Sequence, residues 1–237
     1  MSLLAATLSI QLAVAPYTRP VAHSSFRHGK GYYHVVQADV RSVNVSPKMV
    51  HSPQLTSVWT MIGKSQPLVA ITGTFFSPKY HNPVADVLVN GELVAKGARG
   101  SVVGITHAGN IDIFDSPYLH TVDWKGYQFG MRGAVRVVNA GKVVPNPQAQ
   151  AFKDKAIWGR AARTGIGLTK SGKLVLIATE DKVTLSELGR AMKARGVRSG
   201  VSLDGGSSTC LYYKGKLVIS PKRKLSNLLV ITVRPNL

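Results

Sequence analysis

The sequence has 237 residues and a mass of 25.4 kDa, which fits one large domain and does not require two. Hydrophobic residues make up 44% of the chain and charged residues 17%, which excludes a disordered or low-complexity protein. The net charge of +19 predicts an anionic partner, and the single cysteine, Cys210, excludes an intrachain disulfide and a multi-cysteine metal site.

The N-terminal residues 1–15 carry no charge and end in a small-x-small triplet, which is typical of a signal-peptidase site, although this stretch lacks the basic n-region of a signal peptide. The apolar and polar alternation over 8–14 predicts a strand equally well, and both interpretations stay open. We expect an N-terminal segment over 1–34, with a signal-like stretch at 1–15, followed by one domain over 35–237. No apolar run reaches roughly 18 residues, so no transmembrane segment is predicted.

A first helix is predicted to begin near Ser52. Ser52 is a suitable cap, Pro53 suits the first helical position, and Gly63 is a suitable stop. The apolar residues between them have helical spacing: Leu55, Val58, Trp59 and Ile62.

Turn signals then separate apolar, β-branched runs along the rest of the chain. Glycine supplies the positive φ of a tight hairpin turn, so each signal predicts a β-hairpin. The five predicted turns are Asn90-Gly91, Ala108-Gly109, Ala140-Gly141, Ser171-Gly172 and Lys214-Gly215.

A second helix is predicted over 185–195. Thr184 and Glu187 have the spacing of a capping box, and Gly196 follows as a stop. With many strands and few helices, the sequence predicts an α+β fold: a strand-rich single domain with several hairpins, a mixed sheet and two or three helices.

Only eleven carboxylates are available for acid or base chemistry, and Asp204 is the most informative. It ends the short apolar run 200–203 and precedes Gly205, Gly206 and three hydroxyl residues, an arrangement that suits a polar or anionic ligand. The simpler interpretation is an Asx turn, which most Asp-Gly pairs form. We interpret Asp154, Glu92 and the other carboxylates in turn-like surroundings as solvated surface.

Glu180 closes the apolar run 174–178 just before the second helix. Because that helix can act as a crossover, we expect the strands that end at Glu180 and at Asp204 to be neighbours.

Two further segments end or begin apolar strands with polar groups. The run 71–76 combines hydroxyls with Phe75 and Phe76, whose rings suit a sugar, although such residues are more often core. Arg163 begins another strand, where its guanidinium could hold a phosphate, although an arginine in so basic a chain is usually on the surface.

Other chemistries lack support in the sequence. There is no Walker loop, no G-x-G-x-x-G, no H-E-x-x-H and no G-x-S-x-G elbow, and the seven histidines have no ligand spacing. We therefore expect no metal and no cofactor.

The ordered segments 71–76, 163–167, 183–188, 202–209 and 223–227 together resemble the phosphodiester glycosidase family, over roughly residues 35–233. Thr72 stands where the family usually has Asn, and residues 180–182 read Glu-Asp-Lys where Asp-Gly-Arg is common. The resemblance implies Asp204 as a catalytic carboxylate, with Glu180 as its partner. It also implies a substrate-binding set: Thr72, Gly73, Thr74, Phe75, Phe76, Arg163, Thr164, Gly205, Gly206, Ser207, Ser208, Arg223 and Asn227.

The expected function is hydrolysis of a sugar-1-phosphodiester, between the anomeric carbon and the phosphate oxygen, in an envelope or exopolysaccharide glycan. The expected partner is a phosphorylated glycan or another anionic polymer, and the expected location is extracytoplasmic. In this interpretation Arg163 and Arg223 hold the phosphate. The alternative from another class is a non-catalytic module that binds polyanions, either an anionic glycan or nucleic acid.

Overall fold

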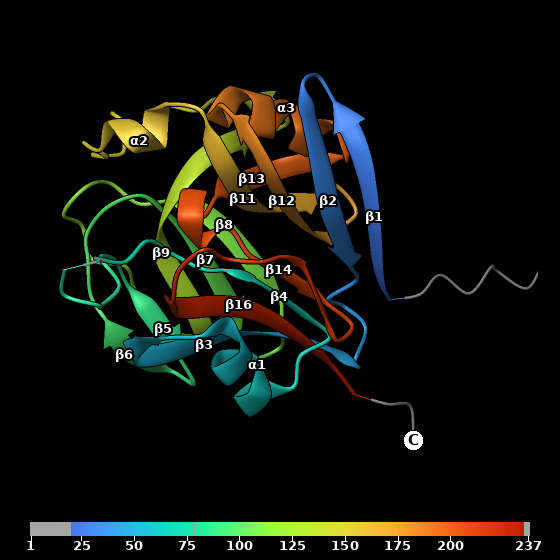
Figure 1. Ribbon diagram of the computed structural model, residues 1–237. Helices are drawn as coiled ribbons and strands as arrows, with labels where there is room; N and C mark the ends of the chain where they lie inside the picture. The colour runs from blue at the N-terminus through green and yellow to red at the C-terminus, as the bar shows by residue number, and fades with distance from the viewer. Residues whose placement is uncertain (1–19, 78, 235–237) are drawn as a thin grey trace, which may run out of the picture.

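The structure is a computed structural model that describes residues 20–77 and 79–234, and Figure 1 shows its two β-sheets. The larger sheet has eleven strands: β1 (Val21–His28), β2 (Gly31–Ala38), β5 (Val87–Val89), β6 (Glu92–Ala95), β7 (Ser101–Thr106), β8 (Ile111–Asp115), β9 (Tyr127–Asn139), β10 (Lys142–Val143), β11 (Ala161–Thr169), β12 (Leu174–Val183) and β13 (Val197–Ser202). The smaller sheet has five: β3 (Val45–Thr56), β4 (Val69–Thr72), β14 (Leu211–Tyr213), β15 (Lys216–Ile219) and β16 (Leu225–Val233).

Helices cover the outer faces of the two sheets, while apolar side chains fill the space between them. In Figure 1, α3 (Leu185–Ala194) lies on the larger sheet at the top and α1 (Val58–Ser65) on the smaller sheet at the bottom. The core between the sheets takes residues from both, such as Leu176 and Met131 from the larger and Ile71 and Leu229 from the smaller. The described part of the chain also contains the short α2 (Lys155–Trp158) and a 3₁₀ turn, η1 (Gly206–Ser208).

The predicted hairpins are confirmed. All five turns join antiparallel neighbours, namely β5 to β6, β7 to β8, β9 to β10, β11 to β12 and β14 to β15. The second predicted helix is also confirmed as α3. Its capping box is closed by the Thr184 amide, which donates to Glu187 Oε2 at 2.7 Å, and by the Glu187 amide, which donates to Thr184 Oγ1 at 3.2 Å.

The predicted start of the first helix is wrong. Ser52 and Pro53 belong to β3, and α1 begins only after its cap at Ser57. The register between β3 and β16 shifts in this stretch, because His51 faces Asn227 while Thr56 faces Leu225. Such an irregularity tolerates a proline, which has no amide hydrogen to donate to a strand partner.

The strand-rich single domain is confirmed, but the expected mixed sheet is not found, since every strand pairing within the described residues is antiparallel. The strands that carry Glu180 and lead to Asp204 are not neighbours either. The order is β12-β11-β13, so β11 lies between them, and α3 crosses over it. Gly165 and Gly167 of β11 leave room for this crossing, because a Cβ at either position would lie within 3.3 Å of the Met192 side chain of α3.

The expected boundary at residues 34 and 35 falls inside β2. Residues 21–28 pair with β2 one by one, so this part of the expected N-terminal segment is an edge of the larger sheet. The signal-like stretch at 1–15 lies outside the described residues. Among the described residues, no helix combines the length and the hydropathy that a bilayer crossing requires.

Candidate active site

Asp204 lies where the two sheets meet, immediately after β13. Its amide donates to the Gly73 carbonyl at 3.0 Å, and its carbonyl accepts from Thr164 Oγ1 at 2.6 Å. Gly73 follows β4 of the smaller sheet, whereas Thr164 belongs to β11 of the larger one. The backbone of Asp204 is therefore fixed from both sides, which leaves its side chain little freedom.

The carboxylate of Asp204 is buried, with 5% of the residue exposed, but it has polar partners. Arg223 Nη2 lies 3.2 Å from Oδ2, and the Ser208 hydroxyl and the Gly205 amide also favour the ionised form of the carboxylate. Burial disfavours the charged form and raises the pKa of Asp204 to about 6, against the opposing effect of these donors. A carboxyl group with such a pKa can exchange a proton near neutral pH.

Arg223 is itself held in place. Its Nε donates to Ser208 Oγ at 2.6 Å, and its guanidinium lies 4.4 Å from the centre of the Phe76 ring. Because the arginine stacks on an aromatic face while it bonds to Ser208 and Asp204, its orientation is fixed from three directions.

A layer of buried polar residues supports this site from behind. The Asn227 amide group pairs with the backbone of Thr74, since Oδ1 accepts from the Thr74 amide at 2.7 Å and Nδ2 donates to its carbonyl at 3.1 Å. Thr72 Oγ1 donates to the Ser208 carbonyl at 2.6 Å. Only glycine fits at position 73, because a Cβ there would lie 2.0 Å from Asn227 Oδ1.

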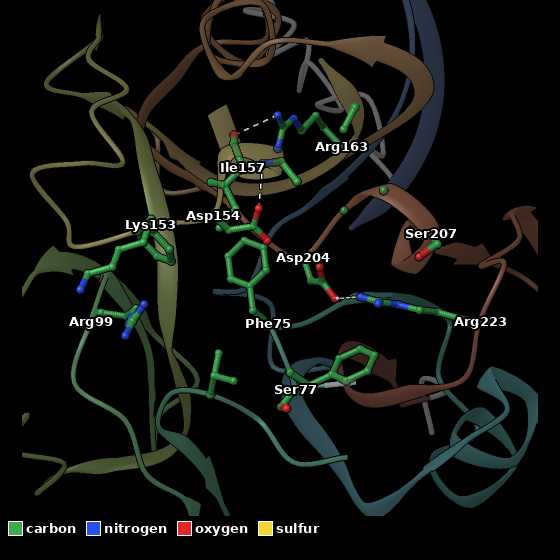
Figure 2. A pocket seen from close by; sticks show the side chains of 17 residues that line it. Phe75, Ser77, Arg99, Lys153, Asp154, Ile157, Arg163, Asp204, Ser207 and Arg223 are labelled. Atoms are coloured by element: carbon green, nitrogen blue, oxygen red, sulfur yellow. Dashed lines mark hydrogen bonds and ion pairs between the residues drawn. The ribbon is translucent and has the colours of Figure 1, made fainter. Parts of the chain in front are cut away.

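The Asp204 side chain borders a cavity of about 600 Å³, which is large enough for a sugar with a phosphate group. Figure 2 shows Phe75, Asp204 and Arg223 near its centre, with Arg99 and Lys153 on the other side of Phe75 from Asp204. Eight of the predicted site residues line this cavity: Phe75, Phe76, Arg163, Asp204, Gly205, Gly206, Ser207 and Arg223. The other predicted binding residues belong to the supporting layer or lie beside it: Thr72, Gly73, Thr74, Thr164, Ser208 and Asn227.

The guanidinium of Arg163 does not have the environment that a phosphate clamp suggests. Its Nη2 donates to the carbonyls of Ile157 and Gly159, and its Nε donates to that of Val183. The residue is 4% exposed, no ion pair with it occurs within the described part of the chain, and burial lowers its pKa. Arg163 thus ties the end of α2 to β12, and two of its nitrogens are already used.

Glu180 does not reach the cavity of Asp204. It is exposed and lines a second, smaller pocket on the other side of Gly206 and Ser207. The strand β11 separates β12 from β13, which accounts for the distance between the two expected partners.

Sequence reasoning missed three charged residues of the cavity: Arg99, Lys153 and Asp154. Asp154 was expected on the solvated surface, and its Oδ1 does cap α2 by accepting from the Ala156 amide at 2.8 Å. Figure 2 shows that this cap also faces the cavity of Asp204. Its position directly before a helical turn was a signal for a cap, but no sequence signal placed that turn beside β13.

No three His, Cys, Asp or Glu side chains come together as metal ligands within residues 20–77 and 79–234. The expectation that the protein uses no metal and no cofactor stays a prediction.

A cavity with a buried carboxylate, cations and aromatic rings suits a glycosidase-like hydrolase. The profile of one such family, the phosphodiester glycosidases, matches residues 65–232. This match spans more than half of the chain and contains both Gly73 and Asp204, so the protein belongs to the phosphodiester glycosidase family. Among individually curated proteins, none matches the sequence.

Solved structures of other proteins share the fold, and they include the following three. The catalytic domain of zebrafish N-acetylglucosamine-1-phosphodiester α-N-acetylglucosaminidase, auto-inhibited by its pro-peptide, is 19% identical, with a TM-score of 0.74 over 93% of this chain and 86% of that one. A hypothetical protein from Synechocystis is 15% identical, with a TM-score of 0.69 over 92% and 63% of the two chains. A Burkholderia pseudomallei protein described as exported is 14% identical, with a TM-score of 0.58 over 85% and 74%.

Proposed function

We propose that the protein hydrolyses a sugar-1-phosphodiester in an envelope or exopolysaccharide glycan. Water adds to the anomeric carbon, the bond from that carbon to the phosphate oxygen breaks, and the products are the free sugar, a phosphomonoester and a proton. The observation that carries the proposal is the buried Asp204 carboxylate, beside Arg223, facing a sugar-sized cavity in a chain of the phosphodiester glycosidase family.

In this reaction Asp204 acts in its ionised form. It stabilises the positive charge that develops at the anomeric carbon or takes a proton from the attacking water. A phosphomonoester leaves readily, so the leaving oxygen needs less protonation than that of an ordinary glycoside. The site therefore works with one well-placed carboxylate and with cations for the phosphate.

Three cations are suited to hold the phosphate: Arg223, Arg99 and Lys153. All three line the cavity, and Arg223 already lies beside the carboxylate. Phe75 supplies an aromatic face for the sugar ring, while the Phe76 ring holds Arg223 in place. Arg163, the expected clamp, has a positioning role in this proposal, because its bonds to backbone carbonyls occupy it.

If a second carboxylate takes part, Asp154 is the better candidate than Glu180. Asp154 lines the same cavity as Asp204, whereas Glu180 lines the neighbouring pocket. One oxygen of Asp154 caps α2, so the other is available to a substrate.

The test is hydrolysis of methyl N-acetylglucosamine-1-phosphate in water labelled with ¹⁸O. The expected result is methyl phosphate without label and N-acetylglucosamine with one labelled oxygen, since the bond to carbon breaks. Label in the phosphate would contradict the proposed bond cleavage, and no hydrolysis of this or of other sugar-1-phosphodiesters would favour the polyanion-binding alternative.

Three variants test which carboxylates take part in the reaction. Asp204→Asn should lower turnover by at least roughly 100-fold, the usual effect of losing a positioned acid or base. Asp154→Asn should lower it more than Glu180→Gln does. Near-normal turnover in a folded Asp204→Asn protein would remove Asp204 from the mechanism, and a larger loss in Glu180→Gln would restore Glu180 as the partner.

We also propose an extracytoplasmic location, where envelope glycans occur. The Burkholderia pseudomallei protein of the same fold, which is described as exported, supports this location. An epitope tag at the C-terminus, followed through cell fractionation of the source organism, tests it.

A further inference from the structure

A second pocket of about 260 Å³ lies directly beside the cavity of Asp204. The two share Ala161, Gly206 and Ser207 in their walls, so only this short stretch lies between them. Figure 2 shows Ser207 on η1, on the Arg223 side of Asp204. The function proposed above does not use this second pocket.

The cations of the second pocket come from two segments that the backbone holds in place. Lys222 donates its amide to the Ser207 carbonyl at 2.8 Å, and the Lys182 carbonyl accepts from Arg160 Nε at 3.0 Å. Arg160 forms an ion pair with Glu187, but no ion pair of Lys182 or Lys222 occurs within the described residues. Two ammonium groups at the pocket are therefore free to meet an anion.

Thr209 adds an unpartnered polar group to the wall of this pocket. The residue is 3% exposed and lines the second pocket, yet its Oγ1 has no hydrogen-bond partner among the described residues. Buried hydroxyls normally have partners, as those of Thr72 and Thr164 do here with the backbone. The hydroxyl is thus a buried donor without a partner among the described residues, in a residue of the pocket wall, and the proposal below has it turn toward a ligand oxygen.

We propose that the second pocket is a subsite for a second anionic group of the substrate, the phosphate of the sugar unit next to the one that is cleaved. This inference rests on the proposed function, and it narrows the substrate class from any sugar-1-phosphodiester to a glycan with phosphates on successive units. Glu180 and Ser220, which also line the pocket, suit the hydroxyls of the sugar between the two phosphates.

The test compares two probes that differ by one charged unit. The first is methyl N-acetylglucosamine-1-phosphate, and the second contains two consecutive N-acetylglucosamine-1-phosphate units ending in the same methyl ester. Calorimetric titration gives Kd for both, and hydrolysis gives kcat/KM for both. The wild type should bind the two-unit probe at least about tenfold more tightly, because a bond to a charged group is worth roughly that factor.

Two variants remove the proposed contacts. Thr209→Val keeps the shape and deletes the hydroxyl, and the double variant Lys182→Met/Lys222→Met deletes both ammonium groups. Each should reduce the preference for the two-unit probe by about fivefold or more. Thr209→Val should leave Tm unchanged, since the hydroxyl has no protein partner whose loss would destabilise the fold.

The matched controls are Thr232→Val and Lys170→Met. Thr232 lies on β16, and Lys170 is exposed in the turn at the far end of β11 from Ala161, so neither lines the pocket. Both controls should keep the wild-type preference. An equal preference in Thr209→Val and wild type, or a loss that the controls share, would overturn the subsite.

The experiment distinguishes failure of the subsite from failure of the proposed catalytic function. Tighter binding of the two-unit probe that depends on Thr209, without hydrolysis of either probe, would keep the subsite and reject the catalytic proposal. Hydrolysis of the one-unit probe with no gain from the second phosphate would keep the catalytic proposal and reject the subsite.

Discussion

The Asp204 carboxylate combines two opposing influences at one residue. Burial favours its neutral form, while Arg223, Ser208 and the Gly205 amide favour the ionised form, and burial prevails to give a pKa of about 6. The protein therefore ionises Asp204 at neutral pH, but at a cost to the folded state. Such a cost is typical of sites where chemistry rather than stability determines the residue.

This cost predicts how stability depends on pH. The folded pKa of about 6 exceeds the usual value of 3.8, so the folded protein binds the proton more tightly than the unfolded chain does. The stabilisation is complete below pH 3.8 and is lost as the pH rises through about 6, which amounts to about 3 kcal/mol. Urea unfolding of wild type and Asp204→Asn between pH 4 and 7 should show the wild type losing most of this amount relative to the variant.

The other titrating groups affect both proteins alike, so the difference between the two curves reports Asp204. Parallel curves would mean that the carboxylate keeps an ordinary pKa in the folded protein. The acid limb of kcat/KM should have the same midpoint near pH 6, because the reaction uses the ionised form.

At this scale the sequence revealed Asp204 but not its surroundings. The apolar run 200–203 that ends at a carboxylate before two glycines is a local pattern, so it can be read without a structure. The cavity partners Arg99 and Asp154 come from segments more than 49 residues away from Asp204, and their approach depends on how the strands pair. The carbonyls that accept from Arg163 could not be predicted either, because every residue has a backbone carbonyl and the sequence does not show which ones come close.

At the scale of elements, Arg163 links three pieces of the fold. Its own strand β11, the end of α2 and the end of β12 meet at its guanidinium. Because α2 and the residues before it carry Asp154 and Ile157 into the cavity wall, the arginine controls the shape of the site without touching the reacting atoms in the proposed reaction.

Arg163→Lys should therefore lower the stability of the fold and weaken the binding of all substrates alike. An ammonium group cannot replace the planar fork that reaches several carbonyls, and a loss of roughly 2–4 kcal/mol in the free energy of unfolding is expected for a buried, bonded cation. KM should rise by similar factors for methyl N-acetylglucosamine-1-phosphate and for an uncharged aryl N-acetylglucosaminide. Arg223→Lys is the matched comparison, and it should impair the phosphodiester more.

A loss in Arg163→Lys that is confined to the phosphodiester would restore Arg163 as a phosphate clamp. Unchanged stability would contradict its role in holding α2.

Hairpin turns and helix caps could be predicted because the residues that form them are close together in the sequence. The turn glycines and the capping box of α3 act within a few residues, and both predictions are confirmed. The position of β11 between β12 and β13 depends on contacts across the whole sheet, so the expected pairing of the strands before Glu180 and Asp204 was wrong. The helix start predicted at Ser52 and Pro53 was wrong for a related reason. Proline is tolerated at an irregularity in a strand as well as in the first turn of a helix, so Pro53 does not distinguish the two.

On the scale of the whole molecule, the basic charge gathers in the segment that builds both pockets. Residues 151–237 contain 17 Lys and Arg against 5 Asp and Glu, a net +12 of the total +19. Lys153, Lys182 and Lys222 of this segment line the two pockets. A surface of this kind attracts a polyanion before any specific contact forms.

The dependence of activity on salt should therefore differ between long and short substrates. For a long phosphorylated glycan, encounter is guided by many charges at once, and kcat/KM should fall at least about tenfold as the salt concentration rises from 50 to 300 mM, through the range where the Debye length shortens past about 8 Å. Methyl N-acetylglucosamine-1-phosphate carries one charge, so screening acts on a single interaction. Its kcat/KM should fall less than about threefold over the same range. A charge-matched comparison of sodium chloride with sodium glutamate excludes direct competition by chloride in the cavity. The same shallow dependence for both substrates would show that the basic surface does not serve substrate capture, and the high charge would then have to be explained by a partner that binds outside the two pockets.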